Sequence, residues 1–311
     1  MTIAFPSNDT MKKMSPKITS RLTGWIEDHS GFFKYGDCPK KVVFELRDDV
    51  SSYVAAKFLT DAFGGSNVFG VVAVTCNDEE NHDRLGRIDE ICMKTGVTVE
   101  QFDLRKATDD MMSRILSEPI NNVSRSMCAS EVRLASVKTL ANVLDAKVIN
   151  TLDLSRINLN DFDVGTDAYG DLLLMSELSD FEIAEFAKFY GFSDELVNSS
   201  EFDFYTSTDT YSRTKFSRGD YFQLEFMWNG NAGRDLTDAE KAVVERISTA
   251  ADPMHEASTW KRRRIRNIPR ISLSRIHREN LDKTTSFHGM DNLTVREFYY
   301  MVMPDVFYQW Y

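Results

Sequence analysis

The sequence predicts an α/β protein: a doubly wound parallel sheet with helices on both faces. The first observation is a pair of short apolar segments, KKVVFEL at 40–46 and NVFGVVAVT at 67–75. Such segments are typical of strands that are covered on both sides, as in a parallel sheet between helix layers. The second observation is that longer segments of helical periodicity separate the strands, which favours crossover connections.

Local signals predict each further element. Apolar residues recur at helical spacing in 50–63, and Gly64 follows where a glycine commonly ends a helix. The segment 80–95 ends in the same way, just before Gly96. The expected order is strand 40–46, helix 50–63, strand 67–75, helix 80–95, strand 98–104, short helix 111–116, helix 130–144 and strand 146–154.

Capping boxes predict where later helices begin. Ser179 and Glu182 have the spacing of a capping box, and the helix that they open ends before Gly191. Boxes of the same type predict helices that start near 237 and near 294. Residues 198–234 are rich in Ser, Asp, Thr, Tyr and Gly, so we expect long loops there.

Composition excludes several classes of protein. The 311 residues include 37 Lys and Arg against 48 Asp and Glu, so the formal net charge is −11. An acidic chain is poorly suited to general nucleic-acid binding, which requires a basic face. No apolar run is long enough to span a membrane, and the first residues lack the apolar core of a signal peptide, so we expect a cytoplasmic protein. Four scattered cysteines without a CxxC pair exclude a disulfide framework and a zinc site of ordinary spacing.

The turn after strand 40–46 is the first place to look for a ligand, because ligands of open parallel sheets bind beyond the carboxyl ends of the strands. A phosphate site there requires glycines that let backbone N–H groups approach the anion. This turn reads Arg47-Asp48-Asp49-Val50-Ser51-Ser52, with two carboxylates and no glycine. From the residues alone it is a poor phosphate cradle, and a helix cap formed by Asp48, Asp49 or Ser51 fits it better.

The succession of segments resembles the ammonia-dependent NAD synthetases, which are PP-loop ATP pyrophosphatases of the adenine nucleotide alpha hydrolase-like fold. The turn of that family reads S-G-G-x-D-S, and aligned on it this chain keeps only Ser52. The segment GGSNVFGVVA at 64–73 matches the second strand region of the family. The similarity extends over residues 20–270 through several short matches in the same order.

Further matches imply where a nucleotide would bind. The family segment A-R-x-R-M is similar to 130–134, G-T-x-N-x-S-E is similar to 150–156, and T-K-Y-G-D is similar to 166–171. The family also ends with H-K-R-x-x-P, where this chain has Trp260 followed by two basic residues. The resemblance therefore implies a nucleotide and deamido-NAD site made of Arg133, Thr151, Tyr169, Asp171, Lys261 and Arg262.

The departures from the family pattern concern the chemistry itself. The loop Arg47, Asp48, Asp49, Ser51 and Ser52 lacks the phosphate-binding glycines, and the two family positions that hold metal are Ser51 and Arg156. We therefore expect a NAD-synthetase-like protein that has lost ATP-pyrophosphatase and amide-forming activity and acts as a binding or structural component. Arg156 is expected to form an ion pair with Asp48 or Asp49, since the charges at these positions are exchanged.

Two alternatives remain open. The first is an active, diverged synthetase that uses ATP, Mg²⁺ and ammonia to convert deamido-NAD to NAD; Asp48 or Asp49 would hold the metal, and Arg47, Arg133, Lys261 or Arg262 would bind phosphate. The second is a sensor that binds NAD or an adenine nucleotide without turnover. ATP, Mg²⁺ and NAD are expected as ligands only on these alternatives.

The resemblance also suggests how the chain is divided. We expect a flexible lead-in at 1–19, a NAD-synthetase-like domain at 20–270 and an aromatic-rich extension at 271–311, which has seven aromatic residues within 298–311. The basic block 261–266 is interpreted as a solvated face or as an anion site. The family is homodimeric, with helices such as 130–144 and the N-terminal helix near the interface, so the resemblance implies a homodimer. The aromatic extension is a candidate surface for a protein partner.

Overall fold

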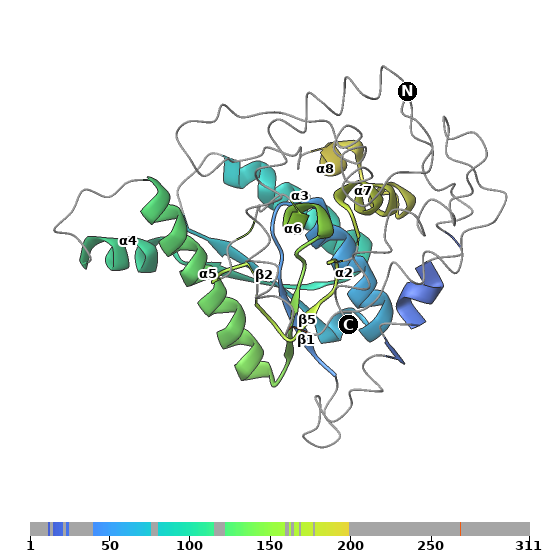
Figure 1. The fold of residues 1–311 in the computed structure, drawn as a ribbon, viewed down its shortest axis with the longest axis horizontal. Coiled ribbons are helices and arrows are strands. Elements are labelled where there is room, and N and C mark those ends of the chain that lie inside the picture. Colours follow the sequence, from blue (N-terminus) through green and yellow to red (C-terminus); the bar gives the residue numbers. More distant parts are fainter. Residues whose placement is uncertain are drawn as a thin grey trace.

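The computed structural model describes residues 40–75, 80–114, 122–158, 169–176 and 178–198, together with 12, 15–20, 23–24, 162, 165–167 and 268. Within these residues the chain alternates between strands and helices from the first strand onward (Figure 1). The strands are β1 (Val42–Glu45), β2 (Val68–Val74), β3 (Thr98–Asp103), β4 (Lys147–Asn150) and β5 (Leu172–Leu173). The helices are α2 (Val50–Phe63), the 3-10 turn η2 (Gly65–Asn67), α3 (Glu80–Thr95), α4 (Arg105–Arg114), α5 (Asn122–Leu144), α6 (Leu154–Asn158), α7 (Asp180–Phe189) and α8 (Asp194–Asn198).

The sheet confirms the predicted fold class. Its five strands are all parallel and lie in the order β3-β2-β1-β4-β5. The chain first moves outward from β1 to β3 and then returns to place β4 on the other side of β1. The strand order therefore reverses between β1 and β4, and ligands of doubly wound proteins bind beyond the carboxyl ends of the strands at such a point.

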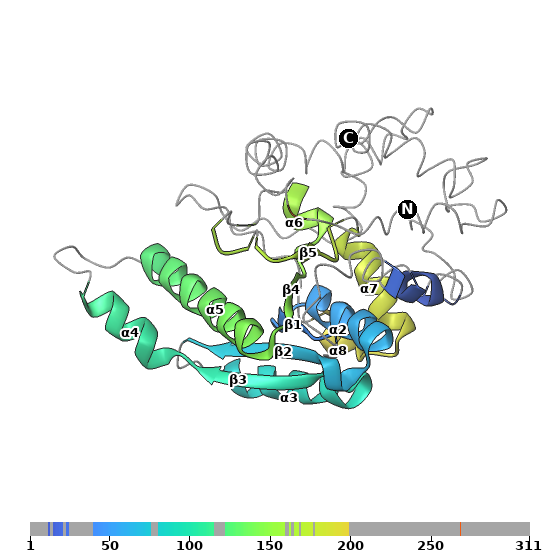
Figure 2. The ribbon, with the colours of Figure 1, turned by 90° about the horizontal axis from the view of Figure 1, so that it is seen from below.

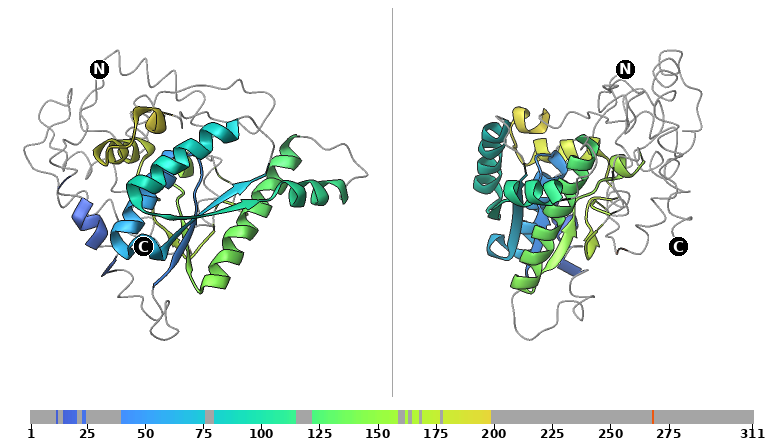
Figure 3. Two further views of the ribbon diagram at one scale, coloured as in Figure 1. Left: turned by 180° about the vertical axis from the view of Figure 1, so that it is seen from behind. Right: turned by 90° about the vertical axis from the view of Figure 1, so that its left-hand side faces the viewer.

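Helices cover both faces of the sheet (Figures 2 and 3). On one face α2, α3 and α7 enclose the larger core, in which Phe44, Phe58 and Phe186 are fully buried. On the other face α5 packs on β1, β2 and β4 through Val137 and Ala141. β1 is buried along its whole length because it lies between these two layers, as the unbroken apolar run at 42–44 indicated.

The N-terminal residues contribute to the core. Residues 15–20 are helical, and the side chain of Ile18 is fully buried within the larger core. Ser15 lies at the start of this turn, and its hydroxyl is 2.7 Å from the hydroxyl of Tyr190. The part of the chain with a place in the core therefore begins before residue 20, inside the segment that the sequence suggested was a lead-in.

Several boundaries differ from the sequence predictions. α4 begins at Arg105 and α5 at Asn122, earlier than expected, because their first turns are polar and give a weak apolar period. The predicted strand 146–154 ends at Asn150, and residues 154–158 form α6 instead. The sequence also did not indicate β5 or α8, which are too short to show a period. The capping box of Ser179 and Glu182 is present as predicted and opens α7.

The predicted helices near 237 and 294, the predicted loops 198–234 beyond Asn198, and the C-terminal extension lie outside the described residues. The same holds for the basic block 261–266, although Ile268 just beyond it packs against the apolar cluster of Leu152 and Leu173. Among the described helices, none has both the length and the apolar character needed to cross a membrane.

A backbone contact between two glycines holds α2 and α3 at the amino end of β2. A Cβ built on Gly65 would lie 2.1 Å from the carbonyl oxygen of Gly96, far inside van der Waals contact. Gly96 itself has φ of 72°, the left-handed region that glycine adopts without strain. The turns after α2 and α3 therefore touch through their main chains, and no side chain fits between them.

We expect Gly65→Ala to destabilise the protein by about 2 kcal/mol or more, because the new methyl group must displace backbone rather than a flexible side chain. Gly86 is the matched control: it lies in α3, where a methyl group added to its Cα would meet nothing within 4 Å. Gly86→Ala should be neutral or stabilising by about 0.5–1 kcal/mol, because alanine favours a helix interior. Urea unfolding of both variants measures the difference, and equal effects would contradict the backbone contact.

Candidate functional site

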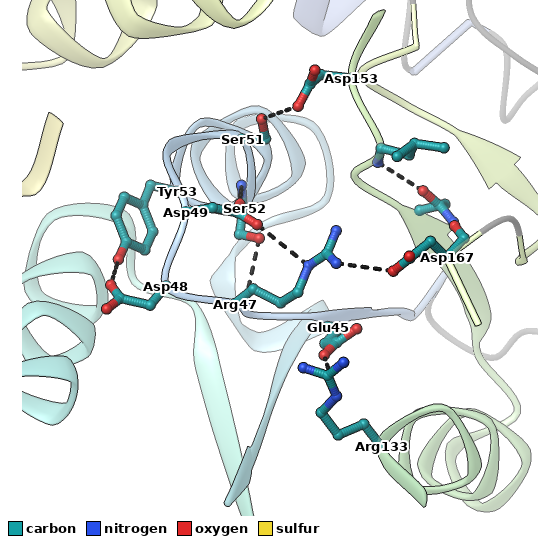
Figure 4. Close-up of polar contacts among 12 residues, drawn as sticks. Glu45, Arg47, Asp48, Asp49, Ser51, Ser52, Tyr53, Arg133, Asp153 and Asp167 are labelled. Carbon is teal, nitrogen blue, oxygen red and sulfur yellow. Dashed lines mark hydrogen bonds and ion pairs between the residues drawn. The ribbon is translucent and has the colours of Figure 1, made fainter. Parts of the chain in front are cut away.

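The candidate site lies where the strand order reverses, at the carboxyl ends of β1 and β4 (Figure 4). β1 leads directly into the loop 46–49, and α2 begins at Val50. Within this loop, Arg47 pairs with the turn 165–167 and Asp48 pairs with α3. On either side of the loop, the last residue of β1 pairs with α5, and the first turn of α2 donates to Asp153, just after β4.

The N-terminus of α2 is already occupied by a carboxylate of the chain. Asp49 is the N-cap, with extended backbone at φ −141° and ψ 152°, and its Oδ1 accepts the N–H of Ser52 at 2.7 Å. The hydroxyl of Ser52 accepts the backbone N–H of Arg47 at 3.3 Å. In a phosphate-binding loop the free N–H groups of the helix start would face the anion. Here an internal anion takes that position.

Arg47 lies between two carboxylates. Its Nε is 3.3 Å from Asp49, and its Nη1 donates to Asp167 at 3.1 Å. The ion pair with Asp49 lacks hydrogen-bond geometry, so the buried Nε has no hydrogen-bond partner. Burial alone would lower the pKa of Arg47, but Asp49, Glu45 and Asp167 raise it further than burial lowers it. The guanidinium is therefore charged, and its charge is balanced within the protein.

Asp48 points to the opposite side of the loop. Arg87 of α3 binds it through two nitrogens, with Nε donating to Oδ1 at 2.9 Å and Nη2 to Oδ2. The hydroxyl of Tyr53 also donates to this carboxylate. Burial, followed by the charge of Asp48, raises the pKa of Tyr53, so the phenol keeps its proton. Asp48 thus joins the loop to α3 and is not free to hold a metal.

Glu45, the last residue of β1, is a buried carboxylate with 7% of its surface exposed. Its Oε1 lies 3.6 Å from Nε of Arg133 on α5, and its Oε2 lies 3.4 Å from the hydroxyl of Tyr169. Nη2 of Arg133 also donates to Ser130 at 2.7 Å. Two residues that the resemblance assigned to a nucleotide site, Arg133 and Tyr169, are therefore brought together around a carboxylate of the chain.

The two family metal positions flank another buried carboxylate, Asp153. Ser51 donates its hydroxyl to Oδ2 of Asp153 at 2.9 Å, and the backbone N–H of Arg156 donates to Oδ1 at 2.9 Å. Burial raises the pKa of Asp153, and the charge of Arg156 opposes that shift. Arg87 pairs with Asp48, and Arg47 pairs with Asp49. The ion pair expected between Arg156 and one of these carboxylates stays a prediction.

The turn with the Tyr169-Gly170-Asp171 sequence is held by backbone contacts. Asn150 donates its side-chain amide to the carbonyl oxygens of Asp167 and Tyr169. Asp171 accepts the backbone N–H of Val148 at 2.8 Å. Gly170 has φ of 105°, where a side chain would be strained. Asp171 therefore supports β4, while Thr151, the residue after β4, is buried at 5% exposure.

The described residues do not fit Mg-ATP. Phosphates would face the capped start of α2, and the nearby carboxylates already bind arginine, tyrosine or serine side chains. No group of three or more His, Cys, Asp or Glu residues in the described part of the chain could hold a metal ion. Lys261 and Arg262 lie outside the described residues.

Sequence reasoning missed several members of this network: Glu45, Arg87, Asn150, Asp153 and Asp167. Glu45 carried one usable signal, because a single acidic residue ends an otherwise apolar strand. Arg87 and Asp167 carried none, since each is an ordinary charged residue in a polar segment and only the fold brings it to the loop.

Comparisons with known proteins agree with the geometry of the fold. No family model matches the sequence, and none of the curated proteins is significantly similar to it. Among solved structures, the chain is similar to the NH₃-dependent NAD synthetase from Campylobacter jejuni, with 16% identity and a TM-score of 0.59 over 81% of this chain and 96% of that one.

The chain has an NAD-synthetase-like fold. An NMN synthetase from Francisella tularensis matches with 16% identity and a TM-score of 0.60, over 81% of this chain and 95% of the other. An NAD⁺ synthetase from Burkholderia pseudomallei matches with 14% identity and a TM-score of 0.53, over 83% and 92%. At these identities the NAD-synthetase-like likeness establishes the arrangement of strands and helices and not the reaction.

The ion pairs of Arg47 predict that removing this side chain destabilises the protein much more than removing the side chain of Arg105. Removing the side chain of Arg47 leaves Asp49 and Asp167 with unbalanced charge in a partly buried site, so Arg47→Ala should destabilise the protein by about 2–4 kcal/mol. Arg105 pairs with Asp103 at the surface, with 45% and 55% of the two side chains exposed, so Arg105→Ala should change stability by less than about 1 kcal/mol. Chemical denaturation compares the two variants. An Arg47→Ala variant as stable as Arg105→Ala would show that the network contributes nothing.

The raised pKa of Asp153 predicts a pH dependence. A carboxyl group whose pKa is higher in the folded state than in the unfolded state stabilises the fold while it is protonated, and this stabilisation is lost as pH rises through the folded pKa. We expect Asp153→Asn to remove this pH-dependent loss of stability. The free energy of unfolding of the variant, relative to that of the wild type, should therefore increase from pH 4 toward pH 8. Thermal unfolding across this range measures it, and a constant difference would rule out the shift.

Proposed function

We propose that this protein carries the NAD-synthetase fold without the ATP-pyrophosphatase reaction and acts as a binding or structural component. The observation that carries the proposal is the carboxylate of Asp49 at the N-terminus of α2, in the position where the phosphates of ATP would have to bind. A triphosphate brings several negative charges, so placing it beside Asp48 and Asp49 would cost electrostatic free energy.

The rest of the network supports the same proposal. A phosphate-binding arginine must have donors free for the ligand, but Arg47 is shared between Asp49 and Asp167. Arg133 likewise lies against Glu45. Carboxylates of the chain therefore take up the cations that a nucleotide would need, and each one would have to be displaced before an ATP molecule could bind.

We also propose that the protein works in the cytoplasm as a homodimer, as the resemblance to the ammonia-dependent NAD synthetases implies. Residues 20–270 would form the NAD-synthetase-like domain, and the aromatic extension 271–311 would provide a surface for a protein partner.

Thermal unfolding with ligands tests the loss of the reaction. Mg-ATP, deamido-NAD and NAD, each near millimolar concentration, should leave the melting temperature unchanged, and no pyrophosphate should be released. A ligand at a hundredfold excess over its Kd would stabilise the native state by about 2.7 kcal/mol. A shift with Mg-ATP together with pyrophosphate release would establish the active synthetase instead. A shift with NAD or deamido-NAD alone, without turnover, would establish the sensor.

A variant that reopens the helix start gives the positive test. Asp49→Gly keeps an acceptable N-cap residue but removes the internal anion, so pyrophosphate should then bind and raise the melting temperature. Asp61→Asn, farther along the same helix, is the control because it changes the net charge equally at an exposed ion pair. If pyrophosphate stabilises the wild type as much as Asp49→Gly, then Asp49 does not block the site.

A further inference from the structure

Ser15 is the one serine or threonine of the sequence that precedes a proline. Of the seven prolines, only Pro16 follows a hydroxyl-bearing residue. The Ser-Pro dipeptide is the acceptor that proline-directed protein kinases recognise, and lysines at 12, 13 and 17 flank it. The chain therefore offers a single acceptor to a kinase of this kind.

The hydroxyl of Ser15 also makes a polar contact between the N-terminal turn 15–20 and the body of the protein. It lies 2.7 Å from the hydroxyl of Tyr190, just after α7, and Figure 2 shows this turn beside α7. Burial raises the pKa of Tyr190, so the phenol keeps its proton. The tyrosine ring packs against three phenylalanine rings, at centroid distances of 6.0, 6.3 and 5.2 Å: Phe58, Phe186 and Phe189.

A single apolar anchor holds the turn in place. Ile18 is fully buried, whereas Pro16, Lys17 and Ser20 are exposed and Ser15 is half-buried. A segment with one buried side chain opens locally at a much lower free energy than the helices of the core. In the open state the Ser-Pro dipeptide is accessible to an enzyme, so the turn supplies both the acceptor and a way to expose it.

A phosphoryl group does not fit the closed arrangement. The two hydroxyl oxygens of Ser15 and Tyr190 are already in hydrogen-bond contact, so phosphate oxygens on Ser15 would have to displace the tyrosine. Lys57 lies over the tyrosine ring, with Nζ 5.6 Å from its centroid, but it is paired with Asp61. A phosphate carries roughly −1.5 to −2 charges at neutral pH, and it would add them beside Asp61 and a half-buried ring.

We propose that Ser15 is a phosphorylation site and that its modification releases the turn 15–20 from the core. A proline-directed kinase transfers the γ-phosphoryl group of a nucleoside triphosphate to Oγ of Ser15. A new O–P bond forms, the bond between the γ-phosphorus and its bridging oxygen breaks, and the hydroxyl proton passes to solvent as the nucleoside diphosphate leaves. The release of Ile18 then uncovers its apolar site in the larger core.

A kinase reaction on the full-length protein tests the site. A purified proline-directed serine/threonine kinase with ATP should add one phosphate, which mass spectrometry should locate at Ser15. Both Ser15→Ala and Pro16→Ala should abolish the modification. Pro16→Ala keeps the acceptor and favours the helix, so its effect reports recognition and not misfolding. A phosphate at another residue, or no phosphate, would overturn the proposal.

Variants of the contact test whether the closed turn protects Ser15. The rate of modification follows the open fraction when opening and closing are faster than the kinase. Ile18→Ala should raise the initial rate about tenfold or more, because the anchor loses most of its apolar side chain. Tyr190→Phe should raise it about fivefold, because one hydrogen bond is lost. The exposed Ser20→Ala is the matched control, and equal rates in all these variants would refute protection by closure.

Hydrogen exchange measures the release itself. After complete phosphorylation, the amides of residues 17–20 should exchange about tenfold faster or more, while those of α2 keep their protection. Treatment with a phosphatase should restore the slow exchange. Unchanged exchange in the phosphorylated protein would show that the phosphate is accommodated beside Tyr190 and would overturn the release. These outcomes are independent of the occupied start of α2, because the turn 15–20 contacts the protein at the end of α7.

Discussion

The capping of α2 by Asp49 is the constraint on which the rest of the carboxyl edge depends. A helix start at the reversal point of a parallel sheet attracts an anion, because its first N–H groups are unpaired and its dipole is positive there. Once the chain supplies that anion itself, its charge has to be balanced. Arg47 does so, and Arg47 in turn requires Asp167. One carboxylate in the loop thus constrains the charges that its neighbours can carry.

Two further ion pairs connect this region to the flanking helices α3 and α5. Asp48 holds Arg87 of α3 on one side of the loop, and Glu45 holds Arg133 of α5 on the other. Each carboxylate also receives a tyrosine hydroxyl, from Tyr53 and Tyr169. Such half-buried pairs are weak sources of net stability, but breaking one leaves a charge without a partner. They therefore specify the arrangement of the edge more than they strengthen it.

The fold class could be predicted from the sequence because β1 and β2 are apolar on both faces and because glycines mark the ends of α2 and α3. The capping box of α7 could also be predicted, since it depends on two residues three positions apart. The residues of the loop were identified, but their partners were not. Arg87 and Asp167 are 39 and 120 residues away from theirs in the chain. A charged side chain in a polar segment does not indicate its contact, and only the topology of the sheet brings the two together.

The burial of Ile18 and the hydroxyl pair of Ser15 with Tyr190 have a consequence for biosynthesis. The two members of that pair are 175 positions apart, and the core that receives Ile18 is completed by α7 and α8. The ribosome therefore makes residues 15–20 well before α7 and α8, with an interval of roughly 10–35 s at ordinary rates of chain elongation. The contact between Ser15 and Tyr190 can form only after that interval, so the helical turn at 15–20 docks onto this part of the core after its own synthesis is complete.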